Sequence, residues 1–98
     1  PALHARIRDI GVLVMPTIAI SPPAIAELEN DMEAWKSANI MTLRNTRLGN
    51  FLDCSALTLP CGKDDNGIPV GLMLMAPSGW EEFLLRMGAA IEPILHKY

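Results

Sequence analysis

Residues 56–75 read ALTLPCGKDDNGIPVGLMLM, which is two apolar runs on either side of a segment dense in turn-forming residues. The runs at 56–60 and 70–75 have the length and composition of strands. Asp64, Asn66 and Gly67 between them favour a tight turn, because Asp, Asn and Gly tolerate left-handed backbone conformations. A proline borders each run and cannot donate to a ladder, so it should mark a strand end. The stretch predicts an antiparallel hairpin.

Three further elements flank this hairpin in the sequence. Residues 10–15 form a short apolar run rich in branched side chains, which predicts a strand buried on both faces. Residues 32–52 contain no proline and repeat apolar side chains every three or four positions, which predicts at least one helix, strongest over 40–52. Ser78 and Glu81 have the spacing of a capping box, and the helix that they begin should end or kink near Glu92, because Pro93 cannot continue a regular helix interior. This order predicts an α/β fold.

The composition favours a part of something larger. Half of the 98 residues are hydrophobic and the mean hydropathy is +0.23, which is rich for a small domain that must cover its own apolar surface. The first residue is Pro1 rather than Met, and residues 2–8 resemble the end of a helix that is already under way. We therefore expect a fragment of one domain.

Charge and hydropathy exclude several classes of partner. The net charge is −3, and the Lys and Arg residues are scattered, so no surface for a phosphate backbone is expected. Residues 10–26 are free of charge, but prolines interrupt them and they fall short of about 20 apolar residues, so we expect no membrane span. No secretion signal is recognisable, which makes the cytoplasm the expected location.

The side chains that could carry chemistry give no local signature of an active site. No serine sits in a Gly-x-Ser-x-Gly turn, where hydrolytic serines are often held. His4 and His96 are predicted at the surface, and Cys54 and Cys61 as buried free thiols, since their spacing fits no zinc site. Residues 64–67 lack the glutamate that closes a calcium loop. We expect no metal and no cofactor.

A longer pattern emerges when residues 50–62, NFLDCSALTLPCG, and 66–77, NGIPVGLMLMAP, are taken together. An Asn is followed by a strand ending in Pro-x-Gly, a Gly-Ile-Pro-Val-Gly strand and a helix that contains Glu. This order and spacing resemble the C-terminal signature of the amidase-signature family. Residues 12–17, VLVMPT, are similar to the strand that precedes it there.

The resemblance implies an α/β/α sandwich around a mixed sheet, with three strands and two or three helices in residues 1–98. It also implies a parent enzyme that hydrolyses a carboxamide C–N bond. In the family a serine attacks the carbonyl, a second serine in a cis peptide relays the proton, and a lysine is the final base. Those groups belong to the N-terminal half of the domain, and none is present here. We expect the chain to hold no catalytic residue and to be inactive alone.

The resemblance also supplies candidate substrate-binding residues. Thr46 lies four positions before Asn50, as it often does in the family, and Arg44, Thr46 and Asn50 are predicted to face the substrate channel. An Asn at a helix end also serves as a structural cap. Where most members have Gly and Pro after the Asn, this chain has Asp53 and Ser55, so the junction between helix and strand resembles the branch that includes allophanate hydrolase. Leu43 replaces an acidic residue of the tRNA-dependent amidotransferase subunits, so glutamine is a less expected ammonia donor.

Two interpretations of the function remain open from the sequence. The first is the C-terminal structural part of an amidase, whose partner is the missing N-terminal part of the same enzyme. The exposed strand edges of such a part should make the isolated chain self-associate. The second is a free-standing noncatalytic module for oligomerisation or partner binding. Neither involves nucleic acid or a membrane.

Overall fold

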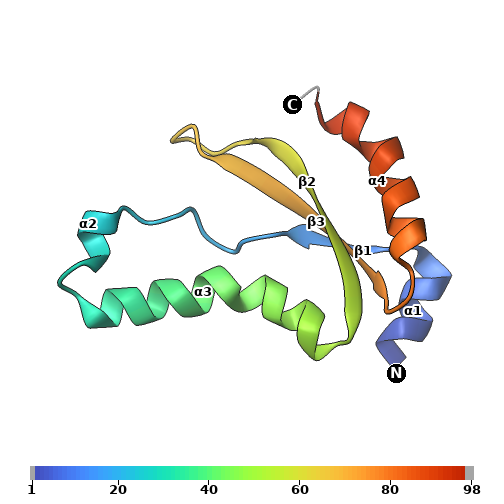
Figure 1. The fold of residues 1–98 in the computed structure, drawn as a ribbon, viewed down its shortest axis with the longest axis horizontal. Coiled ribbons are helices and arrows are strands. Elements are labelled where there is room, and N and C mark those ends of the chain that lie inside the picture. The colour runs from blue at the N-terminus through green and yellow to red at the C-terminus, as the bar shows by residue number, and fades with distance from the viewer. Residues whose placement is uncertain (1, 97–98) are drawn as a thin grey trace.

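The computed structural model describes residues 2–96, apart from the side chains of Leu3 and Ile10. Pro1, which bears on the prediction of a fragment, lies outside the described residues. The elements follow in the order α1 (Ala2–Ile10), β1 (Leu13–Pro16), α2 (Ile25–Leu28), α3 (Met32–Phe51), β2 (Cys54–Lys63), β3 (Pro69–Pro77) and α4 (Glu81–Leu95) (Figure 1).

The predicted α/β fold and its three strands are confirmed. The sheet has the order β1-β3-β2, and both pairs are antiparallel, so the described part shows none of the parallel pairing that a mixed sheet would include. The described residues form four helices where two or three were predicted, since the four-residue α2 is too short to carry a periodic pattern. The first strand begins at Leu13 rather than residue 10, because α1 continues to Ile10.

The predicted hairpin is confirmed, with one correction at its proline. Leu57 pairs with Leu74 and Pro60 with Gly71, and β2 continues past Pro60 to Lys63 through a register shift. Pro60 does not end the strand because β2 lies at the edge of the sheet, where a missing N–H costs no ladder bond if it points outward. Pro69 opens β3 as predicted.

The turn of the hairpin is organised by the Asp64 carboxylate. It accepts hydrogen bonds from the Ser21 hydroxyl at 2.7 Å and from the backbone N–H groups of Asn66 and Ile68, each at 2.9 Å. These bonds, that from Ser21 foremost, hold the pKa of Asp64 below its ordinary value. Hydrogen bonds to the ionised form stabilise it, so residues 64–67 form the predicted turn around this carboxylate.

A pH dependence of stability follows from Asp64. Because its pKa is lower in the folded than in the unfolded chain, its stabilisation is present above the unfolded value of about 4 and is lost as the pH falls through the folded pKa. We expect the urea midpoint to fall below pH 4. In Asp64→Asn, whose amide oxygen still accepts the backbone N–H groups, part of this acid sensitivity should disappear. An unchanged pH profile in Asp64→Asn would contradict this assignment.

Helices cover both faces of the sheet. On one face α4 packs against β2 and β3 (Figure 1), and four buried side chains lie between them, namely Leu59, Leu74, Ala76 and Leu84. Each buried leucine contributes about 1.5–3 kcal/mol relative to exposure. On the other face, a Cβ at Gly49 of α3 would lie 3.1 Å from the Met75 sulfur. Leu74 and Met75 are neighbours in β3 and point to opposite faces, so α4 and α3 form two layers around the sheet.

Helix α3 is a single helix of 20 residues, which extends the strong 40–52 prediction to the whole proline-free segment. The Asp31 carboxylate caps its start by accepting a hydrogen bond from Ala34 N at 3.0 Å. It ends at Phe51 with Leu52 as its C-cap, and Asp53 follows with a φ of 54°. A left-handed residue just after a helix is a common termination, and Asp adopts it more readily than most non-glycine residues.

Helix α4 differs from its prediction at both ends. Its N-cap is Trp80 and makes no side-chain cap bond, so the predicted capping by Ser78 is wrong. The Glu81 carboxylate instead accepts a hydrogen bond from the Ser55 hydroxyl of β2 at 2.8 Å. The helix also continues through Pro93 to Leu95 rather than ending near Glu92. Pro93 lies in the last turn of α4, so the intrahelical hydrogen bond that its missing N–H removes affects only the end of the helix.

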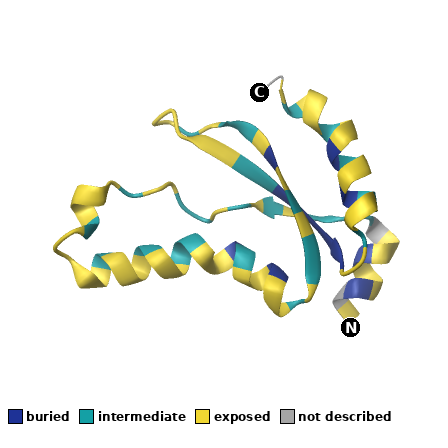
Figure 2. Ribbon diagram, in the orientation of Figure 1, coloured by how far each residue is buried: buried dark blue, intermediate teal, exposed yellow. Residues whose placement is uncertain are grey.

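Residues 2–96 make a thin layer of structure. The Cα radius of gyration is 15.5 Å, whereas a compact domain of about 100 residues has one near 13 Å. The extents are 46 × 34 × 17 Å, and much of α3 is exposed (Figure 2). Large apolar side chains of α3 are among the exposed ones, namely Met32, Trp35, Ile40, Leu43, Leu48 and Phe51. Such a shape leaves an extensive apolar surface open.

Candidate functional site

The three residues predicted to bind substrate all lie in the second half of α3. Thr46 and Asn50 are four positions apart, so they lie one above the other on one side of the helix. Arg44 precedes Thr46 by two positions, which places it more than half a turn around the helix. The fold therefore brings Thr46 and Asn50 together but not Arg44. Their role in binding stays a prediction.

Each of the three has a local environment of its own. The Thr46 hydroxyl donates to Leu43 O at 3.1 Å and is half-buried. Arg44 Nε donates to Asn45 Oδ1 at 3.4 Å. Asn50 is exposed, and its backbone oxygen accepts from Asp53 N at 3.2 Å in the turn that leaves the helix. Asn50 thus takes part in the helix end through its backbone while its side chain remains available.

Asn45 and Gly49 fix α3 onto the sheet, and neither was predicted to matter from the sequence. Both are buried. Asn45 Nδ2 donates to the backbone oxygen of Pro16 in β1 at 2.7 Å, and Gly49 lets the helix approach Met75 closely. A polar residue and a glycine four positions apart inside an otherwise good helix are the signal that could have found this contact. It sets the position of Thr46 and Asn50 relative to the sheet.

A pair of hydroxyl groups crosses the middle strand on the face that α3 covers. Thr17 and Thr58 lie on either side of Gly71, and their hydroxyl oxygens are 3.1 Å apart. A Cβ at Gly71 would lie 2.7 Å from Thr58 Cγ2 and 2.8 Å from Thr17 Oγ1. Glycine is therefore required for the two threonines to meet above β3, where they tie the segment after β1 to β2.

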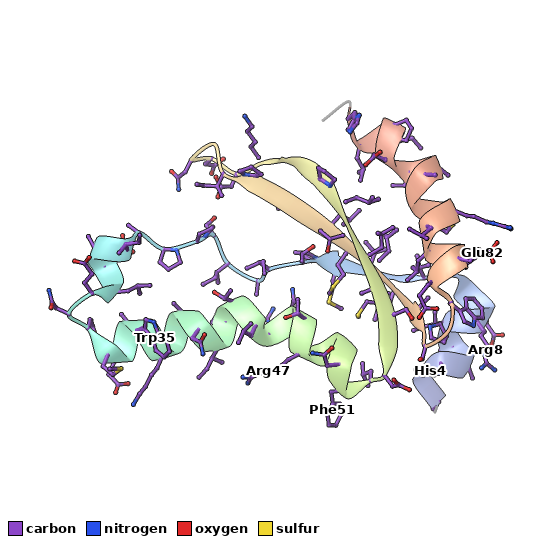
Figure 3. The ribbon with its side chains drawn as sticks, in the orientation of Figure 1. His4, Arg8, Trp35, Arg47, Phe51 and Glu82 are labelled. Carbon is purple, nitrogen blue, oxygen red and sulfur yellow. The ribbon has the colours of Figure 1, made fainter. Side chains whose placement is uncertain are left out.

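Two hollows stand out in the described part of the chain, and neither includes the three predicted residues. The larger, of about 660 Å³, is open and mainly apolar, and lies where α2 meets the start of α3, beside Trp35 (Figure 3). The smaller, of about 250 Å³, lies between residues 18–22 and the start of β3. Binding pockets are commonly concave, and the Thr46 and Asn50 surface does not by itself form one.

Two serines and one histidine are engaged in structural contacts. The hydroxyls of Ser21 and Ser55 donate to the carboxylates of Asp64 and Glu81. His4 is buried, so its predicted surface position is wrong, and its Nε2 lies 2.8 Å from Leu52 O at the junction of α3 and β2. This contact anchors α1 there.

The two cysteines are free, as predicted, but both are half-buried rather than buried. Burial, followed by the negative charge of Asp53, raises the pKa of the Cys54 thiol. A thiol with a raised pKa is protonated at neutral pH and is a poor nucleophile. Within residues 2–96, no three or more His, Cys, Asp or Glu side chains gather in a metal-binding group.

Comparison with known proteins identifies the family. The sequence model of the Amidase family matches residues 2–85, and the chain belongs to this family. It is 39% identical over 87 residues to 2-amino-5-chloromuconic acid deaminase of Comamonas testosteroni, covering 89% of this chain and 19% of that protein. No solved structure gives a significant match.

Relatives with other activities match the same region. A glutamyl-tRNA(Gln) amidotransferase subunit of Streptomyces coelicolor is 34% identical over 85 residues, covering 86% of this chain and 16% of that protein. The fatty acid amide hydrolase of Oryza sativa subsp. indica is 31% identical over 93 residues, covering 92% of this chain and 15% of that protein. The chain thus spans less than a fifth of the length of each of these relatives. The predicted likeness to the allophanate hydrolase branch is not tested by them.

No helix in residues 2–96 combines the length and the apolar character that crossing a bilayer requires.

Proposed function

We propose that residues 1–98 are the C-terminal structural part of an amidase that hydrolyses the C–N bond of a carboxamide. The match to the Amidase family over residues 2–85 carries this proposal. The relatives named above act, by their names, on an aminochloromuconic acid, on glutamyl-tRNA(Gln) and on fatty acid amides. These names have in common a reaction at a carbon–nitrogen bond, while the substrates that they name differ widely.

In this proposal the reacting groups come from the rest of the enzyme. A serine of that part attacks the amide carbonyl, a second serine in a cis peptide relays its proton to the leaving nitrogen, and a lysine acts as the base. A serine needs such a base within hydrogen-bond reach to become a nucleophile. Ser21 and Ser55 of this chain hydrogen-bond carboxylates in structural contacts. The chain alone is therefore expected to be inactive.

Residues 1–98 contribute the sheet, its two helical layers and one polar surface of the substrate site. Thr46 and Asn50 supply a hydroxyl and an amide on one side of α3, which Asn45 and Gly49 hold against the sheet. Such groups orient an amide by hydrogen bonds without taking part in proton transfer. Arg44 lies on another side of the helix, so the proposed substrate-binding pair consists of Thr46 and Asn50.

The test is ammonia release from a panel of simple amides, run on this chain and on the full-length protein that contains it. We expect release by the full-length protein alone. In that protein Thr46→Val should lower kcat/KM about tenfold, the loss of roughly one hydrogen bond. Ser37→Ala, an exposed change on the same helix, is the matched control and should have no effect.

Three outcomes contradict parts of the proposal. Release by the 98-residue chain would show that it carries its own catalytic groups. Silence of both proteins would favour the second interpretation, a noncatalytic module for oligomerisation or partner binding. Equal kcat/KM values for the Thr46→Val variant and the unmodified enzyme would remove Thr46 from the substrate site while leaving the amidase function in place.

A further inference from the structure

The two edges of the three-stranded sheet differ in how their backbone groups are used. Because the order is β1-β3-β2, both β1 and β2 are edge strands. The N–H and C=O groups of successive residues point alternately toward the two edges of a strand. One known hydrogen bond therefore fixes the direction of these groups for every residue of the strand. Thr17 N donates to Gly71 O at 3.0 Å. The groups of Thr17 and Gly71 thus point toward each other.

The outer edge of β1 offers few backbone groups for pairing. By alternation from Thr17, the backbone groups of Pro16 and Val14 point away from β3. Pro16 has no N–H, and its oxygen accepts the hydrogen bond from Asn45 Nδ2. The strand is only four residues long, which leaves Val14 as its one outward N–H. Short length and proline are two devices by which natural proteins close a sheet edge.

The outer edge of β2 is open by the same reasoning. Since Gly71 O points to β1, the groups of Leu72 and Leu74 point to β2, toward Leu59 and Leu57 opposite them. Ala56 and Thr58 therefore turn their N–H and C=O groups outward, and both residues are exposed.

This edge also lacks the usual protection along most of its length. The strand runs for ten residues, and its sequence CSALTLPCGK carries no charge before Lys63. Pro60 and the register shift after it protect only the far end. A long uncharged edge of this kind is a template for another strand.

We propose that β2 pairs at Ala56 and Thr58 with an extended strand from the part of the amidase outside residues 1–98, so that the sheet continues on this side and ends at β1. This inference rests on the proposed function, in which these residues are one part of a longer enzyme. The relatives are long enough to supply such a strand, since this chain covers 15–19% of them. The thin shape and the open apolar surface of the chain agree with burial by that part.

The experiment is residue-resolved amide hydrogen exchange on the full-length amidase. We expect the amides of Ala56 and Thr58 to exchange as slowly as that of Leu57, which β3 already protects, and the amide of Val14 to exchange fast. Fast exchange at Ala56 and Thr58 would overturn the proposal. Slow exchange that depends on protein concentration would also overturn it, because the occupant would then be a second copy.

A pair of proline variants tests the same bonds. Ala56→Pro removes an outward N–H of β2, and Val14→Pro removes the outward N–H of β1. In urea unfolding of the full-length enzyme, we expect Ala56→Pro to lower the folding equilibrium constant about tenfold or more, and Val14→Pro to change it less than about threefold. Equal effects would overturn the proposal. If the Ala56→Pro variant does not fold, amide hydrogen exchange at Ala56 and Thr58 in the unmodified enzyme still tests the proposal.

The test of the edge pairing can fail without the test of the proposed function failing, and the reverse also holds. Ammonia release is measured on the same unmodified sample. An enzyme that releases ammonia but exchanges Ala56 and Thr58 fast retains the function and loses the edge pairing. Protected amides in a protein that hydrolyses no amide would retain the edge pairing and exclude the amidase.

Discussion

Gly71→Ala is expected to destabilise the chain by about 1–3 kcal/mol, as overpacking of a filled site generally does. The new methyl group would lie 2.7 Å from Thr58 Cγ2 and 2.8 Å from Thr17 Oγ1, one on each side. Both neighbours are β-branched and have stiff side chains, so neither can turn away without leaving its preferred rotamer. The measurement is urea unfolding of the chain at one fixed protein concentration.

The double variant Gly71→Ala/Thr58→Ser is the matched control. Serine lacks the Cγ2 atom but keeps the hydroxyl that meets Thr17 Oγ1. Part of the lost stability should return, and the two changes should be non-additive because the residues are in contact. If Thr58→Ser adds its own cost without any recovery, the close contact is not the source of the effect.

Asn45→Asp is expected to cost about 2–4 kcal/mol at neutral pH. Asn45 is buried and donates to the backbone oxygen of Pro16 at 2.7 Å, whereas an ionised carboxylate can only repel that oxygen. Burial should raise the pKa of the new carboxyl in the folded chain. The loss should therefore be small below the unfolded pKa of about 4 and grow as the pH rises through the folded pKa. Urea midpoints between about pH 4 and pH 8 measure it.

Two variants control for this result. Asn50→Asp makes the same change on an exposed face of the same helix and should alter stability by less than about 0.5 kcal/mol. Asn45→Leu leaves the Pro16 oxygen without its donor and should cost about 1–3 kcal/mol with no dependence on pH. A similar loss in Asn45→Asp and Asn50→Asp would mean that helix charge, rather than the Pro16 contact, is responsible.

The sequence predicted the elements whose signals are local. The hairpin follows from the composition of residues 56–75, and α3 follows from an apolar repeat free of proline. Two of the errors occurred where a contact with a residue far away in the sequence determines the structure. Ser78 and Glu81 have capping-box spacing, but Ser55 from another strand takes the Glu81 carboxylate. His4 is polar and near the end of the chain, yet the carbonyl of Leu52 holds it in a buried position.

The candidate site was less predictable than the fold, for a related reason. Arg44, Thr46 and Asn50 came from a family pattern, which carries no information about helix faces. The structure shows that only Thr46 and Asn50 share a side, because four residues nearly complete a turn and two residues do not. Asn45 matters through Pro16, 29 positions earlier in the chain. Such a pairing has no local signal in a single sequence.

The pairing of β1 has a consequence for the order in which the chain folds. Val14 pairs with Leu74, about sixty residues further along, whereas the two strands of the hairpin are joined by a short turn. Closing the longer loop costs about 2 kcal/mol more in chain entropy, so β1 should dock after the hairpin has formed. During synthesis at about 5–20 residues per second, β1 would wait several seconds for its partner strand. Because β1 is apolar and stays unpaired until β3 has been synthesised, it is a segment that a chaperone could bind during that interval.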